Sequence, residues 1–259
     1  MTNRMPALFL GHGNPMNAMA DNDYTGAWSA LGREIPRPRA VLCISAHWYE
    51  SLRAVTAAAR PGTIHDFGGF PEELYKVQYP APGDPDLAEQ VAGLLGSDGF
   101  GLDGSRGLDH GAWSVLAHVY PEADVPIVQL SIDRSQPAGW HYALAQKLQS
   151  LRDDNVLIVG SGNIVHNLRA YDWGNADTEA FNWAQRFERL ARDHLRRADF
   201  VPLVEYKSLG PDAMLAAPTP DHYLPLLYVL AQHTEGEPLT FPVEGFEGGS
   251  ISMLAVQTG

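Results

Sequence analysis

Cysteine, long apolar runs and positive charge are all scarce in this chain of 259 residues. Cys43 is the only cysteine, so no internal disulfide can form, and a small domain held together by disulfides is excluded. No apolar run approaches the roughly 20 residues that a membrane-spanning helix needs. The 18 basic residues are outnumbered by 31 acidic ones, and a formal net charge of -13 repels phosphate backbones and anionic lipids. We therefore expect no nucleic-acid partner and no membrane association.

We also expect no secretory signal, no internal repeat and no linker. Residues 1–6 are largely polar, and the apolar run after them is only a few residues long, unlike a signal peptide. Because the single cysteine also sits in an apolar segment, we expect a soluble cytoplasmic protein. With 45% hydrophobic residues the chain can bury a sizeable core, so we expect residues 1–259 to form a single domain.

One pattern does recur: a short apolar run that ends just before a histidine. Such runs are typical of parallel strands buried on both faces. Ligands of open α/β sheets bind outside the carboxyl ends of the strands, so we expect these histidines to meet at one edge of a sheet. The runs and their histidines are residues 7–10 with His12, residues 41–44 with His47, and residues 156–159 with His166.

Predicted strands alternate with predicted helices along the whole chain. Further strands are expected at 52–59, 126–132, 239–243 and 251–257, and a long amphipathic helix at 181–195. This alternation predicts an α/β sandwich with a largely parallel sheet.

A fourth histidine, His222, precedes the apolar residues 226–231. Pro225 lacks an N–H and fits only the first turn of a helix, which places the helix start near Asp221 or His222. The positive end of the helix dipole disfavours protonation of an imidazole there. His222 is therefore expected to be neutral, the form that binds metals.

Spacing alone leaves two alternatives open for the ten histidines. His110 stands at the start of a probable helix and His65 in an aromatic, glycine-rich loop at 61–71, whereas His118, His141, His194 and His233 lie in helical patterns without such surroundings. No HExxH or CxxC fixes a metal site, so a shared site and scattered histidines are equal alternatives. The GSGN stretch lacks the third glycine of a dinucleotide turn, and no GxSxG supports a serine hydrolase.

Several stretches taken together resemble a known family. They run in order along nearly the whole chain, and their combination is highly specific although each is short. The sequence resembles the class III (LigB-type) extradiol ring-cleavage dioxygenases, in the branch of the 4,5-DOPA extradiol dioxygenases. The matching stretches are 10–16 (LGHGNPM), 45–48 (SAHW), 64–71 (IHDFGGFP), 79–83 (YPAPG), 109–111 (DHG), 160–168 (GSGNIVHNL) and 220–225 (PDHYLP).

The resemblance implies a three-layer α/β/α sandwich with a mixed, mostly parallel central sheet and one mononuclear metal site. His12, His47 and His222 match the metal ligands of the family. His166 matches its acid–base histidine, and could also close on the metal when substrate is absent. His110 matches a histidine near substrate or dioxygen.

The implied reaction inserts both atoms of O2 into a catechol such as DOPA. Three firm protein ligands leave the metal enough open positions for the catechol and dioxygen. Fe(II) is the expected working metal because it can relay electrons, which zinc cannot. Imidazole also suits zinc, so we expect zinc in the protein as purified.

The pocket around such a site needs aromatic or apolar walls for the ring. The expected substrate contacts are Trp48, His65, Phe67, Phe70 and Tyr223, and a carboxylated catechol would also need a cation such as Arg169. Two rival functions use the same histidines: a zinc-dependent hydrolase that activates water, and a non-enzymatic metal-binding protein. The sequence leaves the oligomeric state open.

Overall fold

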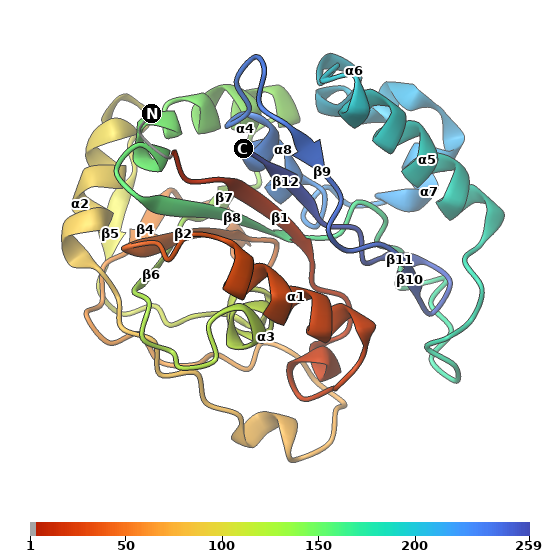
Figure 1. Ribbon diagram of the computed structural model, residues 1–259, viewed down its shortest axis with the longest axis horizontal. Helices are drawn as coiled ribbons and strands as arrows, with labels where there is room; N and C mark the ends of the chain where they lie inside the picture. Colours follow the sequence, from red (N-terminus) through yellow and green to blue (C-terminus); the bar gives the residue numbers. More distant parts are fainter. Residues whose placement is uncertain (1–3) are drawn as a thin grey trace.

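A six-stranded sheet forms the centre of the protein in a computed structural model that describes residues 4–259 (Figure 1). Its strands, in spatial order, are β6 (Ile127–Gln129), β2 (Ala40–Ser45), β8 (Val156–Gly162), β1 (Ala7–Gly11), β12 (Val256–Thr258) and β9 (Leu239–Thr240). The first four are parallel, β12 is antiparallel to β1, and β9 is antiparallel to β12. The predicted mixed, mostly parallel sheet is confirmed.

The parallel strands are apolar along their whole length because both faces of the sheet are covered. In β1, Phe9 belongs to the apolar cluster on one face, while Leu8 and Leu10 belong to the cluster on the other. In β2, Leu42 and Val41 alternate in the same way. Strands of this kind appear in a sequence as unbroken apolar runs, which is why they could be predicted.

Helices pack on both sides of the sheet, giving three α/β/α layers (Figure 1). Side chains of α1 and α3 join the cluster on one face, and those of α2, α4, α5, α7 and α8 join the other. None of the helices between residues 4 and 259 is both long enough and apolar enough to cross a bilayer. The helices are α1 (Asp23–Glu34), α2 (Pro85–Leu94), α3 (His110–Val119), α4 (Ala138–Gln146), α5 (Asn182–Arg196), α6 (Val201–Val204), α7 (Pro211–Ala216) and α8 (Leu224–Leu230).

Side-chain caps fix where the two helices on the first face begin. The Asn22 side chain accepts from the Thr25 amide and the Thr25 hydroxyl accepts from the Asn22 amide, a reciprocal capping box for α1. The Asp109 carboxylate accepts from the Ala112 amide at the start of α3. This cap makes His110 the first residue of a buried helix.

The apolar stretch 126–132, predicted as one strand, is divided in two. Its first part is β6, but its last part is β7 (Ile132–Asp133), which pairs with β3 (Tyr49–Glu50) beside the central sheet. Between β6 and β7 the Ser131 amide donates to the Ala54 carbonyl, so at this residue the chain no longer pairs with β2. The position of a partner strand, which the local sequence does not encode, decides where this strand breaks.

Other predicted strands are also shorter than expected, for the same reason. Only the parts that find a partner strand form a ladder, so 52–59 reduces to β4, 239–243 to β9, and 251–257 divides into β11 and β12. The remaining strand pairs are β4 (Ala54–Thr56) with β5 (Gly101–Asp103), and β10 (Phe246–Glu247) with β11 (Ile251–Ser252). Short 3₁₀ turns are η1 (Pro15–Ala18), η2 (Leu74–Lys76), η3 (Gly96–Asp98), η4 (Gln149–Arg152) and η5 (Tyr206–Leu209).

Candidate active site

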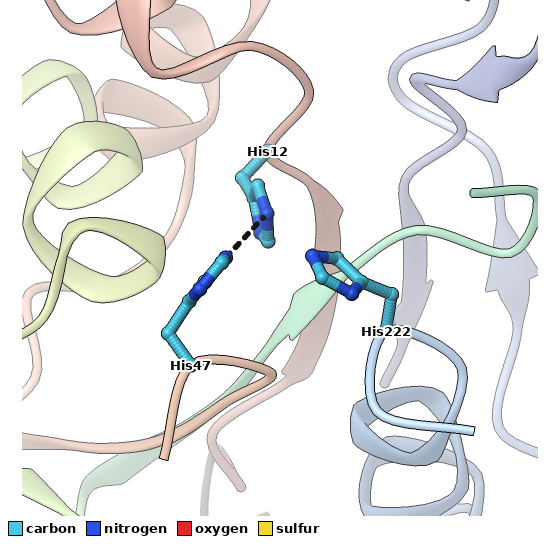
Figure 2. A group of neighbouring side chains, drawn as sticks. All are labelled: His12, His47 and His222. Carbon is cyan, nitrogen blue, oxygen red and sulfur yellow. Dashed lines mark hydrogen bonds between the residues drawn. The ribbon is translucent and has the colours of Figure 1, made fainter. Parts of the chain in front are cut away.

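Three histidines converge beyond the carboxyl ends of β1 and β2 (Figure 2). His12 directly follows β1, His47 follows β2 by two residues, and His222 stands two residues before α8. One ring nitrogen of each lies within 4.8 Å of those of the other two. The expectation that strand-end histidines meet at one sheet edge is therefore met for His12 and His47, with His222 arriving from the helix side.

The spacing of these nitrogens suits a shared metal ion. The Nε2 atoms of His12 and His47 are 3.3 Å apart. Two nitrogens that each lie about 2.1 Å from one ion, at tetrahedral or octahedral angles, would be separated by about 3.0–3.4 Å. The donor set therefore fits a divalent transition metal held by three imidazoles.

Hydrogen-bond partners fix the tautomer of His12. The Ser161 hydroxyl donates to the Gly111 carbonyl, so its oxygen accepts from Nδ1–H of His12 at 3.0 Å. The proton is therefore on Nδ1, and Nε2 presents its lone pair to the centre of the cluster.

Carboxylates lie beside the outer nitrogens of the other two ligands. Asp221 accepts from Nδ1 of His222 at 2.5 Å, and a carboxylate oxygen of Asp66 lies 3.4 Å from Nδ1 of His47. The second oxygen of Asp66 accepts from Nδ1 of His110 at 2.9 Å and from the His110 amide. These contacts favour, in all three candidate ligands, the tautomer with its proton on the outer nitrogen, as is common in metal-binding histidines.

Burial keeps these imidazoles neutral. Burial, reinforced by the neighbouring histidines, holds the pKa of His12 and of His222 well below the ordinary value near 6.5. Burial and then His110 lower the pKa of His47 to about 3, against the opposing charge of Asp66. For Asp66 burial acts to raise the pKa, but hydrogen bonds and charge from His110 and His47 outweigh it and lower the value to about 2. The site therefore combines neutral ligands with an ionised carboxylate behind them.

Two glycines of β8 let the loop before α8 approach the sheet. A Cβ on Gly162 would lie 2.2 Å from the His222 carbonyl oxygen, and one on Gly160 would lie 2.4 Å from the Pro225 oxygen. The Asn163 amide donates to the His222 carbonyl in the space this leaves. The GSGN stretch thus serves close backbone packing, and Pro225 lies in the first turn of α8 as predicted.

His110 and His166 complete a ring of five histidines around one cavity. The His110 ring centroid lies 3.8 Å from that of His47, and His166 stacks face to face on His222 with centroids 3.5 Å apart. Burial lowers the pKa of His166 to about 4. His166 is not in the group whose nitrogens converge within 4.8 Å, so its joining the metal stays a prediction.

A cavity of about 260 Å³ opens over the histidines. Phe67 and Phe70 lie in its wall, as the sequence predicted. The cavity is also lined by Leu168, Tyr171 and Trp173, which the sequence analysis did not single out. The cavity thus has aromatic walls above a floor of imidazoles.

Comparison with known proteins gives the family. A family model described as the catalytic LigB subunit of aromatic ring-opening dioxygenase matches residues 6–243, which is most of the chain. The chain belongs to this family. A 4,5-DOPA dioxygenase extradiol from Escherichia coli K12 is 51% identical, covering 99% of this chain and 95% of the relative. The protein of the same name from Beta vulgaris is 35% identical, covering 95% and 93%.

A solved structure matches this chain over nearly its whole length. The crystal structure of an uncharacterised protein from Escherichia coli K12 has a TM-score of 0.87 and 46% identity, and the match covers 99% of this chain and 100% of that chain. The family and its relatives identify the chain as an extradiol aromatic ring-opening dioxygenase.

Three expected substrate contacts of this LigB-family chain do not line the cavity and need correction. Trp48 is 1% exposed and stacks under the Arg106 guanidinium at 4.5 Å. Tyr223 is fully buried, and its hydroxyl donates to the Leu203 carbonyl. Nε2 of His65 donates to the Val77 carbonyl. Each of the three side chains is engaged in holding a loop or the core.

Sequence reasoning missed the residues that orient the ligands. It quoted Asp66 and Asp221 within their motifs but gave them no role, although each stands directly beside a histidine in the chain. Ser161 was likewise treated as part of a glycine turn. The place of Asp221 beside the candidate ligand His222 was a usable signal. Asp66 adjoins His65 and not the histidines that it contacts, and the contact from Ser161 to His12 spans 149 residues, so neither could be found in this way.

Proposed function

We propose that this LigB-family enzyme is an Fe(II)-dependent extradiol dioxygenase that opens the ring of a catechol, with DOPA or a similar catechol as substrate. The observation that carries the proposal is three imidazoles with inward lone pairs at the floor of an aromatic cavity. Bound Fe(II) would relay electrons from the catechol to dioxygen. The DOPA dioxygenase relatives support the substrate class.

The chain's own residues would supply orientation and proton transfer. Phe67 and Phe70 provide the apolar wall against which an aromatic ring can lie. His110, held by Asp66, and His166, stacked on His222, both line the cavity within reach of a ligand on its floor. They are placed to take a proton from the catechol hydroxyls and to return one later.

The three-imidazole site also bears on which metal the protein carries. All three candidate ligands are imidazoles, which suit zinc as well as iron, and zinc lies above Fe(II) in the order of affinities of divalent metals for a given site. We therefore expect zinc after aerobic purification, in a form that leaves catechols intact. The carboxylates of Asp66 and Asp221 supply negative charge through the histidines they contact. A cytoplasmic location stays a prediction.

Reconstitution with a chosen metal tests the proposal. The protein is stripped, reloaded without oxygen with either Fe(II) or zinc, and mixed with DOPA or simple catechols before oxygen is added. The iron form should consume oxygen and yield a coloured ring-opened aldehyde acid, and the zinc form should do neither. A His47→Ala variant treated with iron in the same way is the matched control and should stay inactive.

The rival functions give different outcomes in the same experiment. Hydrolysis of an ester or amide by the zinc form, with every catechol untouched by the iron form, would establish a hydrolase. Tight binding of either metal without any turnover would favour a non-enzymatic metal-binding protein.

A further inference from the structure

The electrostatic character of the cavity distinguishes between catechols with different side chains. Within residues 4–259, no lysine or arginine lines the cavity, and Asp66 is the only carboxylate in its wall. Arg106 contacts the His47 carbonyl, Asp109 and the Trp48 ring, and it is not among the residues that line the cavity. A carboxylate on the substrate would therefore find no cationic partner in the wall.

The burial of the lining residues shows which end of a ligand meets which wall. His12, His110 and His222 are 2–7% exposed and form the floor, whereas Leu168 and Trp173 are 48% and 66% exposed and form the mouth. The catechol oxygens belong at the floor, beside the imidazoles. A substituent para to one of the hydroxyls would point toward the mouth, away from any charge on the metal.

Two aromatic rings lie at the mouth, and an acid contacts one of them. Trp173 packs edge to face on Tyr171, with ring centroids 4.7 Å apart. The Tyr171 hydroxyl donates to Glu247, which is 8% exposed and also accepts from the Asn14 amide in the cavity wall. An indole face attracts cations more strongly than the other aromatic rings do, and a carboxylate behind the wall adds to the attraction. The mouth is thus built for a positive group.

We propose that the cavity selects catechols whose side chain ends in an ammonium group, with Trp173 as the residue that contacts it, and disfavours catechols that carry only a carboxylate. The inference rests on the proposed function, because it assumes that a catechol occupies the cavity. DOPA would then be recognised through its amine, and its carboxylate would remain in water outside the mouth.

Binding to the zinc-loaded protein tests this without turnover. Three ligands share the ring and a two-carbon spacer and differ in the end group: dopamine, 3,4-dihydroxyphenylpropionate and 4-propylcatechol. Calorimetry at pH 7 should show that dopamine binds about tenfold more tightly than 3,4-dihydroxyphenylpropionate. The indole attracts the ammonium group of dopamine, and the acidic wall repels the carboxylate of the other ligand. In the iron-loaded enzyme the same preference should appear mainly in KM, since the end group is remote from the reacting atoms.

Variants separate Trp173 from a general effect of the loop. Trp173→Ala should weaken the binding of dopamine by roughly two- to fivefold and reduce the difference in affinity between dopamine and the carboxylate ligand. The affinity of Trp173→Phe for dopamine should fall between those of Trp173→Ala and the wild type. Val201→Ala removes an equally exposed apolar side chain, 67% exposed and outside the cavity, and should change nothing.

Three results would overturn the inference. The first is that 3,4-dihydroxyphenylpropionate binds as tightly as dopamine, with all three ligands binding. This result would refute the selectivity for an ammonium group and leave the proposed function unaffected. The second is an Arg169→Gln variant that selectively weakens the carboxylate ligand, since Arg169 is exposed beside Leu168 and would then be the missing cation. The third is no binding of any catechol, which would overturn the proposed function as well.

Discussion

The three candidate ligands differ from the histidines elsewhere in the described residues by the convergence of their ring nitrogens. Nδ1 of His12, His47 and His222 faces Ser161, Asp66 and Asp221, which leaves each Nε2 for the centre of the cluster, where those of His12 and His47 lie 3.3 Å apart. In contrast, Nε2 of His118 is used by the Asn17 carbonyl, and Nδ1 of His194 pairs with Asp199 on the surface. His194 also bonds through Nδ1, so an available Nε2 does not by itself mark a ligand; the convergence of one ring nitrogen from each of three histidines within 4.8 Å does.

Metal content of single variants tests the ligand set. His12→Ala, His47→Ala and His222→Ala should each lose the metal, because three ligands leave none to spare. His194→Ala is the control and should keep full stoichiometry. Asp221→Asn should keep the fold and bind metal roughly 10–100-fold more weakly, since it disturbs only the partner of His222. Full metal content in a folded ligand variant would remove that histidine from the site.

The acid–base histidines should matter for rate. His110→Ala and His166→Ala should keep the fold, and His110→Ala should also keep the metal. Loss of a proton-transfer group typically lowers the rate by about 10²–10⁴-fold. The measurement is the rate of oxygen uptake by iron-loaded protein at saturating catechol over several pH values. Rates near the wild-type value in both variants would contradict the proposed proton transfer.

At the scale of elements, local pattern predicted some features and not others. The strands before His12 and His47 were predictable because burial on both faces makes their sequence apolar throughout. The break between β6 and β7 was not, because it depends on pairing with distant β3. The position of Trp48 was also unpredictable, since Arg106, which covers its ring, lies 58 residues further along the chain.

The packing of the loop before α8 against β8 predicts that Gly162 positions His222. Gly162→Ala should push back the His222 carbonyl, costing about 3 kcal/mol of folding free energy and weakening metal binding. Gly139→Ala in α4 is the control, because its nearest heavy atom would be 3.8 Å away, and it should be neutral or slightly stabilising. Thermal unfolding and metal titration of both variants provide the readout. Wild-type metal affinity in Gly162→Ala would refute the idea that this glycine positions His222.

At the scale of the whole molecule, buried neutral histidines link stability to pH. His141 lies in the core with Nδ1 bonded to the Tyr228 hydroxyl, and burial lowers its pKa from near 6.5 to about 4. At pH values between these two, the His141 imidazole binds a proton in the unfolded chain but not in the folded chain. The free energy of unfolding must therefore fall as the pH drops from 7 toward 4.

A comparison of two proteins isolates this effect. Between pH 7 and pH 5, His141 should account for about 2 kcal/mol of lost stability in the metal-free protein. Urea unfolding of wild type and His141→Gln at both pH values measures the difference, and the variant should show the shallower dependence. Equal slopes would mean that folding leaves the pKa of His141 unchanged, and would contradict this account. Coincident curves from fluorescence and circular dichroism would also support the single-domain interpretation of residues 1–259, which stays a prediction.

The central claim is that this LigB-family enzyme places both atoms of dioxygen into a catechol. The most direct measurement is mass spectrometry of the product formed from DOPA by iron-loaded protein under oxygen-18, with immediate borohydride reduction to stop aldehyde exchange with water. The account predicts two heavy oxygen atoms in the ring-opened product and none when only the water is labelled. A product with label from water alone, or an unopened ring, would contradict it.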